Sequence, residues 1–204
     1  MQSMRPDSLD RALVLFDEVV KAGGSLKWAA RNEQAAIERR LGKTQDALTF
    51  YEEVLRGDAK PVEKWEALCA KGDIFYELGA NDPENYRRAI GFFDQLSAQR
   101  DAPSHWRHQA LFKTGMCLEK LNQPAEALAT FYRVVEQESR QTQRREFFWY
   151  YKAGFNAARL LEQQAQWQPA AAVYEKLAFA GGGRSEEAKA RLDRLRLEHF
   201  LWAD

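Results

Sequence analysis

The sequence predicts an all-α protein in which antiparallel helix pairs stack into a solenoid. Hydrophobic residues make up 45% of the chain, which is sufficient for a real core. Apolar residues recur at the helical period along most of the chain. One motif built on this period occurs four times, and a second small residue precedes each copy at a nearly regular distance. A unit that repeats in this way needs neighbouring units to cover its apolar face.

The motif is found in the segments TFYEEVL, GFFDQL, TFYRVV and AVYEKL. In each copy a small, an aromatic and an aliphatic residue occupy positions i, i+4 and i+7, which lie on one face of a helix. The aligned triplets are Ala47/Tyr51/Val54, Ala89/Phe93/Leu96, Ala127/Phe131/Val134 and Ala170/Tyr174/Leu177. We interpret each copy as the second helix of a pair.

A small residue upstream of each motif marks the first helix of the pair. These residues are Ala35, Gly72, Gly115 and Ala158. Three separations agree, since 47−35, 127−115 and 170−158 all equal 12, whereas 89−72 equals 17. We expect the small residues of paired helices to face each other and allow close approach. The five extra residues lie in ANDPENY, where an Asp82 cap and Pro83 in the first turn predict a second helix longer by about one turn.

The segments KGDIFYELG and TGMCLEKLN, each followed by Ala-x3-Phe/Tyr, resemble the tetratricopeptide repeat over about residues 26–183. The resemblance implies a right-handed solenoid whose first helices line a concave groove that binds a protein segment. Successive copies start 42, 38 and 43 residues apart (89−47, 127−89, 170−127), which is longer than the usual period of about 34. The closing segments GGGRSEEA and LRLEHFLW also resemble the C-terminal part of long bacterial tetratricopeptide proteins.

The predicted elements follow one another within a single domain over residues 1–204. They are a half-repeat helix at 8–22, repeats at 26–60, 63–101, 104–138 and 144–180, and a capping helix at 184–202. In the half-repeat, Ala12, Phe16 and Val19 have the register of a second helix, and no first helix precedes them. We expect either a longer parent array or an incomplete first pair.

The capping helix is predicted from RSEEAKARLDRLRLEHFLW. One side of this helix carries Ala188, Leu192, Leu195 and Trp202, and the other side is strongly charged. A helix of this kind covers the last repeat of an array and exposes polar side chains to water.

The charge balance argues against a nucleic-acid-binding protein. Basic and acidic residues number 30 each, so no overall field attracts a polyanion. The segment RQTQRREFFWYYK mixes cations with aromatic residues and is the one local alternative, which we interpret instead as a charged helix start followed by packing aromatics. No apolar run is long enough to span a membrane, and the opening MQSMRPDSLD is not an export signal. We expect a soluble protein, cytoplasmic or periplasmic depending on any preceding part.

No convergent catalytic set is evident, so we predict a non-enzymatic protein without cofactor or metal. His105 and His108 are three residues apart and could share a metal ion, but no third ligand is apparent. GGGRSEEA could hold an anion, although a glycine turn into the last helix with Ser185 as N-cap explains it as well. Cys69 and Cys117 lie in helical patterns and are expected to be buried reduced thiols, with one disulfide as the alternative.

The resemblance places the binding groove on the first helices. Its expected residues are Phe112, Lys113, Met116, Phe148, Trp149, Lys152, Phe155, Asn156 and Arg159. Aromatic rings there would give contact area, and the cations would favour an acidic peptide; the alternative is that the aromatics are core. The carboxylate clamp of chaperone-binding relatives is matched only at Lys152, since Cys69, Asp73 and Lys113 depart from it.

The sequence therefore predicts a protein-protein interaction scaffold. The alternative is a structural segment of a larger repeat protein that packs within its own chain or self-associates through the N-terminal half-repeat.

Overall fold

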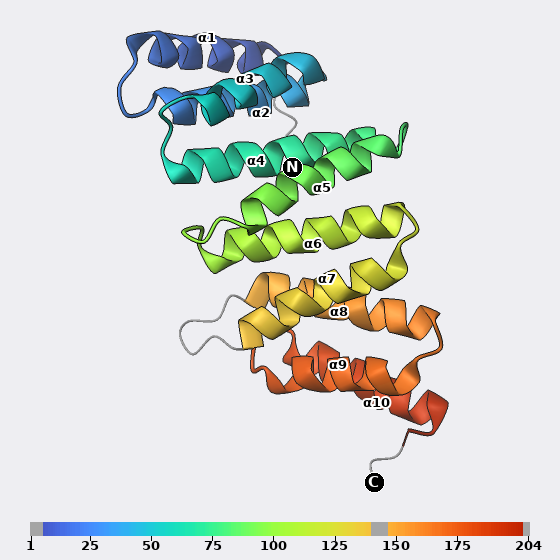
Figure 1. The fold of residues 1–204 in the computed structure, drawn as a ribbon. Helices are drawn as coiled ribbons and strands as arrows, with labels where there is room; N and C mark the ends of the chain where they lie inside the picture. Colours follow the sequence, from blue (N-terminus) through green and yellow to red (C-terminus); the bar gives the residue numbers. More distant parts are fainter. Residues whose placement is uncertain (1–5, 140–146, 202–204) are drawn as a thin grey trace. The chain divides into compact units, whose positions relative to one another are not determined.

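The computed structural model describes residues 6–139 and 147–201. These residues form ten helices and contain no strand, which confirms the all-α class (Figure 1). The chain divides into two compact units, Met1–Ala102 and Pro103–Asp204. We refer to them as unit 1 and unit 2 and describe each by itself.

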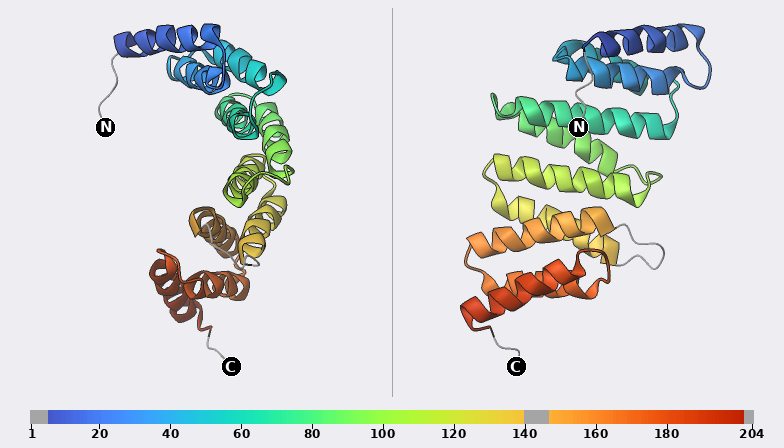
Figure 2. Two further views of the ribbon diagram at one scale, coloured as in Figure 1. Left: turned by 90° about the vertical axis from the view of Figure 1, so that its left-hand side faces the viewer. Right: turned by 180° about the vertical axis from the view of Figure 1, so that it is seen from behind.

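Unit 1 contains five helices and its own buried core. They are α1 (Pro6–Ala22), α2 (Lys27–Arg40), α3 (Thr44–Arg56), α4 (Pro61–Leu78) and α5 (Glu84–Ser97). Helices α2 and α3 form one pair, α4 and α5 form the next, and the first helices α2 and α4 also contact each other. The second helices α3 and α5 both lie on the other side of this layer (Figure 2).

Unit 2 repeats this arrangement. Its helices are α6 (Ser104–Lys120), α7 (Pro124–Ser139), α8 (Phe147–Gln163), α9 (Trp167–Phe179) and α10 (Ser185–His199). Helices α6 and α7 pair, as do α8 and α9, while the first helices α6 and α8 contact each other. Helix α10 packs against α9, and its Ala188, Leu192 and Leu195 are buried as the sequence predicts. Trp202 lies outside the described residues.

The repeated motif forms the core of both units. All twelve residues of the four aligned triplets are at most 3% exposed, and Ala35 and Ala158 are fully buried. The helices that carry the motif therefore pack into the core through the triplet residues that the pattern identified. The division into two units does not test the repeat boundaries expected from the sequence, and these boundaries remain a prediction.

Three of the links inside helix pairs share one backbone geometry. Gly42, Asn122 and Ala165 occupy equivalent places with φ of 78°, 57° and 55°. The next residue donates its N–H to a carbonyl five positions back, for example Lys43 to Glu38 at 2.9 Å. This is a Schellman-type helix end, which satisfies the last carbonyls and reverses the chain within three residues. It explains why α2, α6 and α8 are each followed by an antiparallel second helix.

The second repeat does not have the elongated second helix that ANDPENY suggested. Helix α5 has 14 residues, against 13 for α3 and 16 for α7. The five extra residues are shared by the end of α4, the link before Glu84 and the first half-turn of α5. Asp82 accepts the Glu84 N–H at 3.0 Å, but the N-cap position of α5 is occupied by Pro83, one residue before the helix. No single element takes the whole insertion, so α5 is not lengthened by a full turn.

The contact between paired helices also differs from the expected meeting of two small residues. A Cβ built on Gly72 would lie 2.3 Å from the ring of Phe93, and one built on Gly115 would lie 2.5 Å from the ring of Phe131. The small residue of the first helix thus receives the aromatic ring of the second. Close packing of the pair depends on a ring filling the space that a missing side chain leaves.

Helix α1 covers one side of α2, and its outer side has no neighbour among the described residues. Its register residues Ala12, Phe16 and Val19 are half-buried, whereas Leu9 and Val20 are the buried ones. This differs from a second helix inside the array, which is covered from two sides.

Candidate protein-binding surface

Four of the expected groove residues form a single, partly exposed cluster in unit 2. Phe112 projects from α6, while Phe148, Trp149 and Lys152 project from α8. The rings of Phe112 and Trp149 are 5.4 Å apart, and Phe148 meets Trp149 edge-on at 4.7 Å. We call these four residues the α6/α8 surface.

The Lys152 ammonium lies near all three rings of this surface. Its Nζ lies 4.6 Å from the ring centre of Phe148, 5.1 Å from Trp149 and 5.7 Å from Phe112. A cation within about 6 Å of a ring face is attracted by the ring quadrupole. Phe112 and Trp149 are partly buried against the core, whereas Phe148 is 56% exposed. The rings are thus neither fully core nor fully solvated.

A polar group continues the same face of α8 by one and two turns. The Asn156 side chain donates to the Lys152 carbonyl at 2.8 Å and accepts from Arg159 at 3.1 Å. Arg159 also forms an ion pair with Glu119 of α6 at 2.5 Å. Glu119 could not be singled out from the sequence, because its part in the site depends on which residues of α6 and α8 face each other. Glu119 partly neutralises Arg159, one of the cations expected to attract an acidic ligand.

The remaining expected residues fall in different surroundings. Lys113 and Met116 are half-buried on α6, and Met116 packs against the core of unit 2. Phe155 is buried and lies beneath Arg184 and Arg191, at 4.4 and 4.7 Å from their guanidinium carbons. It therefore packs toward α10 and is not part of the α6/α8 surface. In unit 1, the expected groove residue Cys69 is likewise buried.

The two histidines do not converge. His105 is exposed on α6 beside Trp106, whereas His108 is fully buried, with its Nδ1 3.2 Å from the Glu138 carboxylate of α7. Across residues 6–139 and 147–201, no group of three or more His, Cys, Asp or Glu is placed to hold a metal ion. Sequence spacing had suggested a shared face, but burial of one ring separates the two. Cys69 and Cys117 are both buried free thiols, as expected.

The glycine-rich turn before α10 is occupied by the protein's own groups. Arg184 pairs with Glu187 at 2.7 Å, and the Gly182 N–H is bonded to the Tyr151 hydroxyl at 3.1 Å. Ser185 is the first helical residue, so it is not the N-cap; its hydroxyl donates to the Gly182 carbonyl at 2.8 Å. The basic part of RQTQRREFFWYYK, residues 140–146, lies outside the described residues.

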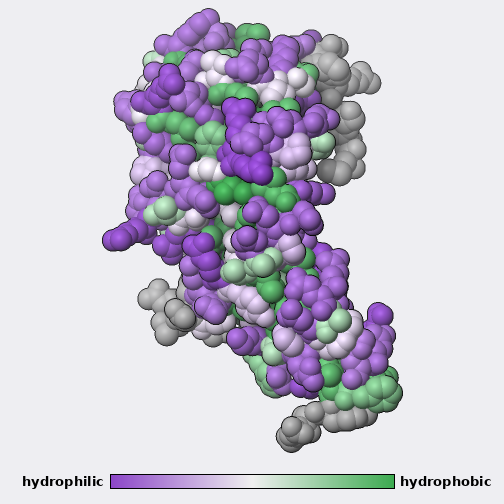
Figure 3. Space-filling view, turned by 45° about the vertical axis from the view of Figure 1, so that its right-hand side comes forward, coloured by the Kyte–Doolittle hydropathy of each residue, from purple (hydrophilic) through white to green (hydrophobic). Residues whose placement is uncertain are grey.

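Other apolar side chains reach the surface in small patches. Figure 3 shows such patches among hydrophilic side chains on the face it presents. Phe200, which is 75% exposed, belongs to the end of unit 2 beyond α10. None of the helices in the described ranges is both long and apolar enough to cross a bilayer.

Stacked antiparallel helix pairs define the class of helical-repeat proteins. A model of the tetratricopeptide repeat family matches residues 109–139, which correspond to most of α6 and all of α7. The chain therefore carries a tetratricopeptide repeat, and its fold is the tetratricopeptide helix-pair solenoid. No curated protein matches the sequence.

Solved structures support this fold. Similar chains include a kinesin light chain-type protein of Podosopora anserina with nearly identical TPR-like repeats, at 18% identity and a TM-score of 0.60, covering 91% of this chain and 89% of that chain. Pseudomonas aeruginosa pilF matches at 16% identity and a TM-score of 0.57, covering 96% and 94%. BtubC from P. vanneervenii matches at 13% identity and a TM-score of 0.60, covering 97% and 92%.

Proposed function

We propose that this protein is a non-catalytic scaffold that binds a segment of a partner protein at the α6/α8 surface of unit 2. The proposal rests on one observation, the exposed Phe148 that stands beside Trp149 and Phe112 with the Lys152 ammonium among the three rings. Aromatic groups of this kind supply contact area at low entropic cost. Proteins with this fold generally act in protein-protein interactions.

The charges around the surface favour a segment that carries a carboxylate beside an apolar side chain. Lys152 can pair with a carboxylate while the rings take the apolar group. Arg159 contributes less, because Glu119 already holds it in an ion pair. We therefore expect an acidic peptide to bind at this surface, through Lys152 more than through Arg159.

The test compares proteins captured by the wild-type chain with those captured by Lys152→Glu and Phe148→Ala. Lys189→Glu is the matched control, since Lys189 is exposed on α10 away from the α6/α8 surface. We expect a specific partner to be lost from both α6/α8 variants and kept by Lys189→Glu, with unchanged melting temperatures. Equal retention by all three variants would move the binding site elsewhere.

A second candidate function is self-association through α1. Val14 and Leu15 are 61% and 62% exposed on this helix. Burial of such side chains between two copies would be favourable by about 25 cal/mol per Å² of apolar surface. Sedimentation on dilution, with Val14→Glu/Leu15→Glu for comparison, tests this idea. A wild-type chain that stays monomeric at all concentrations would exclude it.

A further inference from the structure

A groove runs along unit 1 between the second helices of its two helix pairs. Helices α3 and α5 form its walls, and one face of α4 forms its floor. Two adjoining hollows of about 380 and 700 Å³ make up the groove and share several lining residues. We call it the α3/α5 groove and define it by Glu52, Lys64, Lys71, Phe75, Arg88 and Phe92.

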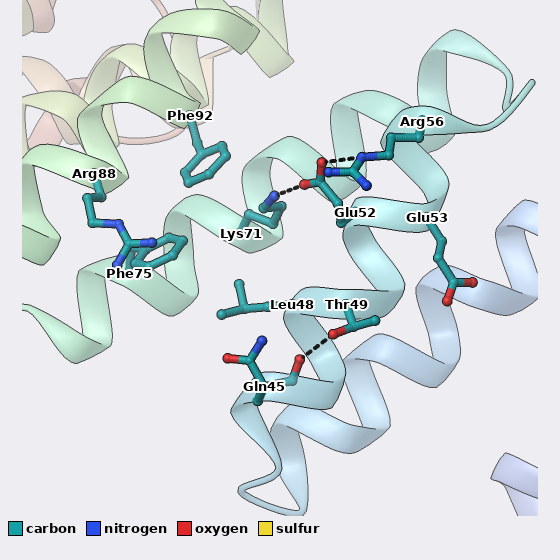
Figure 4. Close-up of a pocket in the computed structure, with 10 residues that line it drawn as sticks. All are labelled: Gln45, Leu48, Thr49, Glu52, Glu53, Arg56, Lys71, Phe75, Arg88 and Phe92. Atoms are coloured by element: carbon teal, nitrogen blue, oxygen red, sulfur yellow. Dashed lines mark hydrogen bonds and ion pairs between the residues drawn. The ribbon is translucent and has the colours of Figure 1, made fainter.

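The groove has an apolar centre. The rings of Phe75 from α4 and Phe92 from α5 stack with centroids 5.4 Å apart and planes inclined by only 9°. Leu48 of α3 lies across from them (Figure 4). Phe92 is half-buried, so part of its surface stays accessible from the groove. An apolar side chain that entered here would meet rings on one side and an aliphatic group on the other.

A buried lysine lies beside this centre. The Lys71 side chain is 9% exposed, pairs with Glu52 of α3, and has its Nζ 4.7 Å from the Phe92 ring centre. Glu52 also accepts a hydrogen bond from Arg56 at 2.9 Å, so two cations share one carboxylate. The hydrogen bond from Lys71 is the largest cause that lowers the pKa of Glu52 below its ordinary value. This arrangement leaves one positive charge in excess.

Two further cations lie along the groove. The guanidinium of Arg88 is stacked over Phe75 at 4.0 Å, and its hydrogen bond goes to the amide oxygen of Asn85. Lys64 lines the other hollow. Within the described part of the chain, Arg88 forms no salt bridge, and its side chain bonds only to Asn85. The hydrogen bond from Trp28 is the largest cause that lowers the pKa of Asp58, and the charge of Lys64 also contributes. Arg88 is therefore the more available of the two cations to an incoming acidic group.

The acidic residues that line the groove offset these charges only in part. Glu52 is already shared, and Glu53 points away from Lys71 and pairs with Arg31 at 2.9 Å (Figure 4). Asp101 lines only the larger hollow, as Lys64 does, so it leaves the charge of Arg88 in the other hollow uncompensated. An apolar centre beside Arg88 and beside the surplus charge of Lys71 and Arg56 matches a ligand that carries apolar side chains flanked by carboxylates.

The groove also has a suitable length for a short helix. Its lining residues on α3 extend from Gln45 to Arg56, and 56−45 gives 11 residues, or about 16 Å at 1.5 Å per residue. An amphipathic helix of about three turns has this length and places an apolar stripe on one side.

We propose that the α3/α5 groove is a second docking site, which binds an acidic amphipathic helix of a partner protein. The apolar stripe of that helix lies on Phe75 and Phe92, and its carboxylates pair with Arg88 and Lys64. The site is in unit 1 and uses none of the α6/α8 residues, so it stands independently of the function proposed above.

The test uses two synthetic fluorescein-labelled peptides whose binding is followed by anisotropy. One is a three-turn amphipathic helix with a leucine stripe flanked by glutamates, and the other has every glutamate replaced by lysine. We expect saturable binding of the acidic peptide alone, weakened about tenfold by Arg88→Glu and less by Arg88→Gln.

Arg87→Glu is the matched control. Arg87 adjoins Arg88 on α5, but its side chain is 60% exposed and pairs with Glu84 outside the groove. It should leave the affinity unchanged. Equal weakening by Arg87→Glu and Arg88→Glu would show general attraction of an acidic peptide and would overturn the assignment.

Three other outcomes would also overturn it. Saturable binding of neither peptide would exclude an acidic helix as the ligand. Loss of binding in Lys152→Glu, with Arg88→Glu unaffected, would place the peptide on the α6/α8 surface. A dimer that becomes monomeric in Arg88→Glu would show that a second copy of the chain occupies the groove.

Discussion

Two glycines on neighbouring helices of unit 1 have opposite surroundings. Gly72 of α4 is packed under the ring of Phe93, whereas a Cβ on Gly91 of α5 would meet no atom within 4 Å. Glycine is thus required by packing at position 72, whereas at position 91 it only lowers the stability of the helix. The difference follows from which face of each helix carries the glycine.

We predict opposite effects for the same substitution at these sites. Gly72→Ala should lower the free energy of unfolding by about 1–3 kcal/mol, because the new methyl group overlaps the Phe93 ring. Gly91→Ala should raise it by about 0.5–1 kcal/mol, because alanine is the better helix former. Urea unfolding measures both. A destabilised Gly91→Ala, or an unaffected Gly72→Ala, would contradict the packing of this pair.

A buried tyrosine makes the stability of unit 1 depend on pH in the alkaline range. Burial raises the pKa of Tyr51 to about 12, above the ordinary value of about 10. Between these values the unfolded chain releases the phenolic proton while the folded chain keeps it. The unfolded state therefore binds fewer protons, and the free energy of unfolding falls as the pH rises.

Tyr51→Phe removes this contribution. We expect its free energy of unfolding to fall less steeply than that of the wild type between about pH 10 and pH 12. Chemical unfolding at a series of pH values, with the slopes compared, is the measurement. Parallel slopes would mean that the Tyr51 hydroxyl ionises equally in the folded and unfolded chains.

At the scale of the element, the links inside the helix pairs differ in how well their sequence suits their backbone. Gly42 adopts a left-handed conformation without steric cost, and Asn122 tolerates it. Ala165 adopts the same conformation at φ 55° with a Cβ that disfavours it. The fold therefore imposes a turn that the sequence does not favour at this position.

Ala165→Gly should accordingly stabilise the protein by about 1 kcal/mol. Gly42→Ala is the reverse substitution in the equivalent link and should destabilise the protein by a similar amount. Thermal unfolding of both variants, each compared with the wild type, tests the expectation. Destabilisation by Ala165→Gly would show that the alanine side chain contributes contacts that outweigh its strain.

At the scale of the whole molecule, each unit has a core of its own. One cluster of buried residues in unit 1 extends from Ala35 to Ile74, and one in unit 2 extends from Leu111 to Leu195. Local opening can therefore differ between the units, because the free energy of opening depends on the contacts made within each cooperative region.

Hydrogen exchange of the Gly115→Leu variant tests this independence. The leucine would overlap the Phe131 ring and should cost about 1–3 kcal/mol or more. We expect amides of α6 and α7 to exchange about tenfold faster or more, with amides of α3 and α4 nearly unchanged. Equal acceleration in α3 and α4 would show that the two units open as one.

The sequence by itself determined the all-α class, the helix pairs and their core. The i, i+4, i+7 triplets are all buried, because a helical period places them on one face whatever the neighbouring helix does. The same helical period identified the buried residues of α10 and placed the aromatic and cationic residues of α8 on one face. These inferences concern residues within one or two turns of each other.

Only the tertiary structure decided which of these residues meet. It joined Phe112 of α6 to Trp149 and Lys152 of α8, directed Phe155 toward α10, and buried His108 away from His105. It also formed the α3/α5 groove, which no sequence motif marks. The physical reason is that contacts between helices depend on their axial rotation and crossing, and these are set by how all the side chains of a unit pack together.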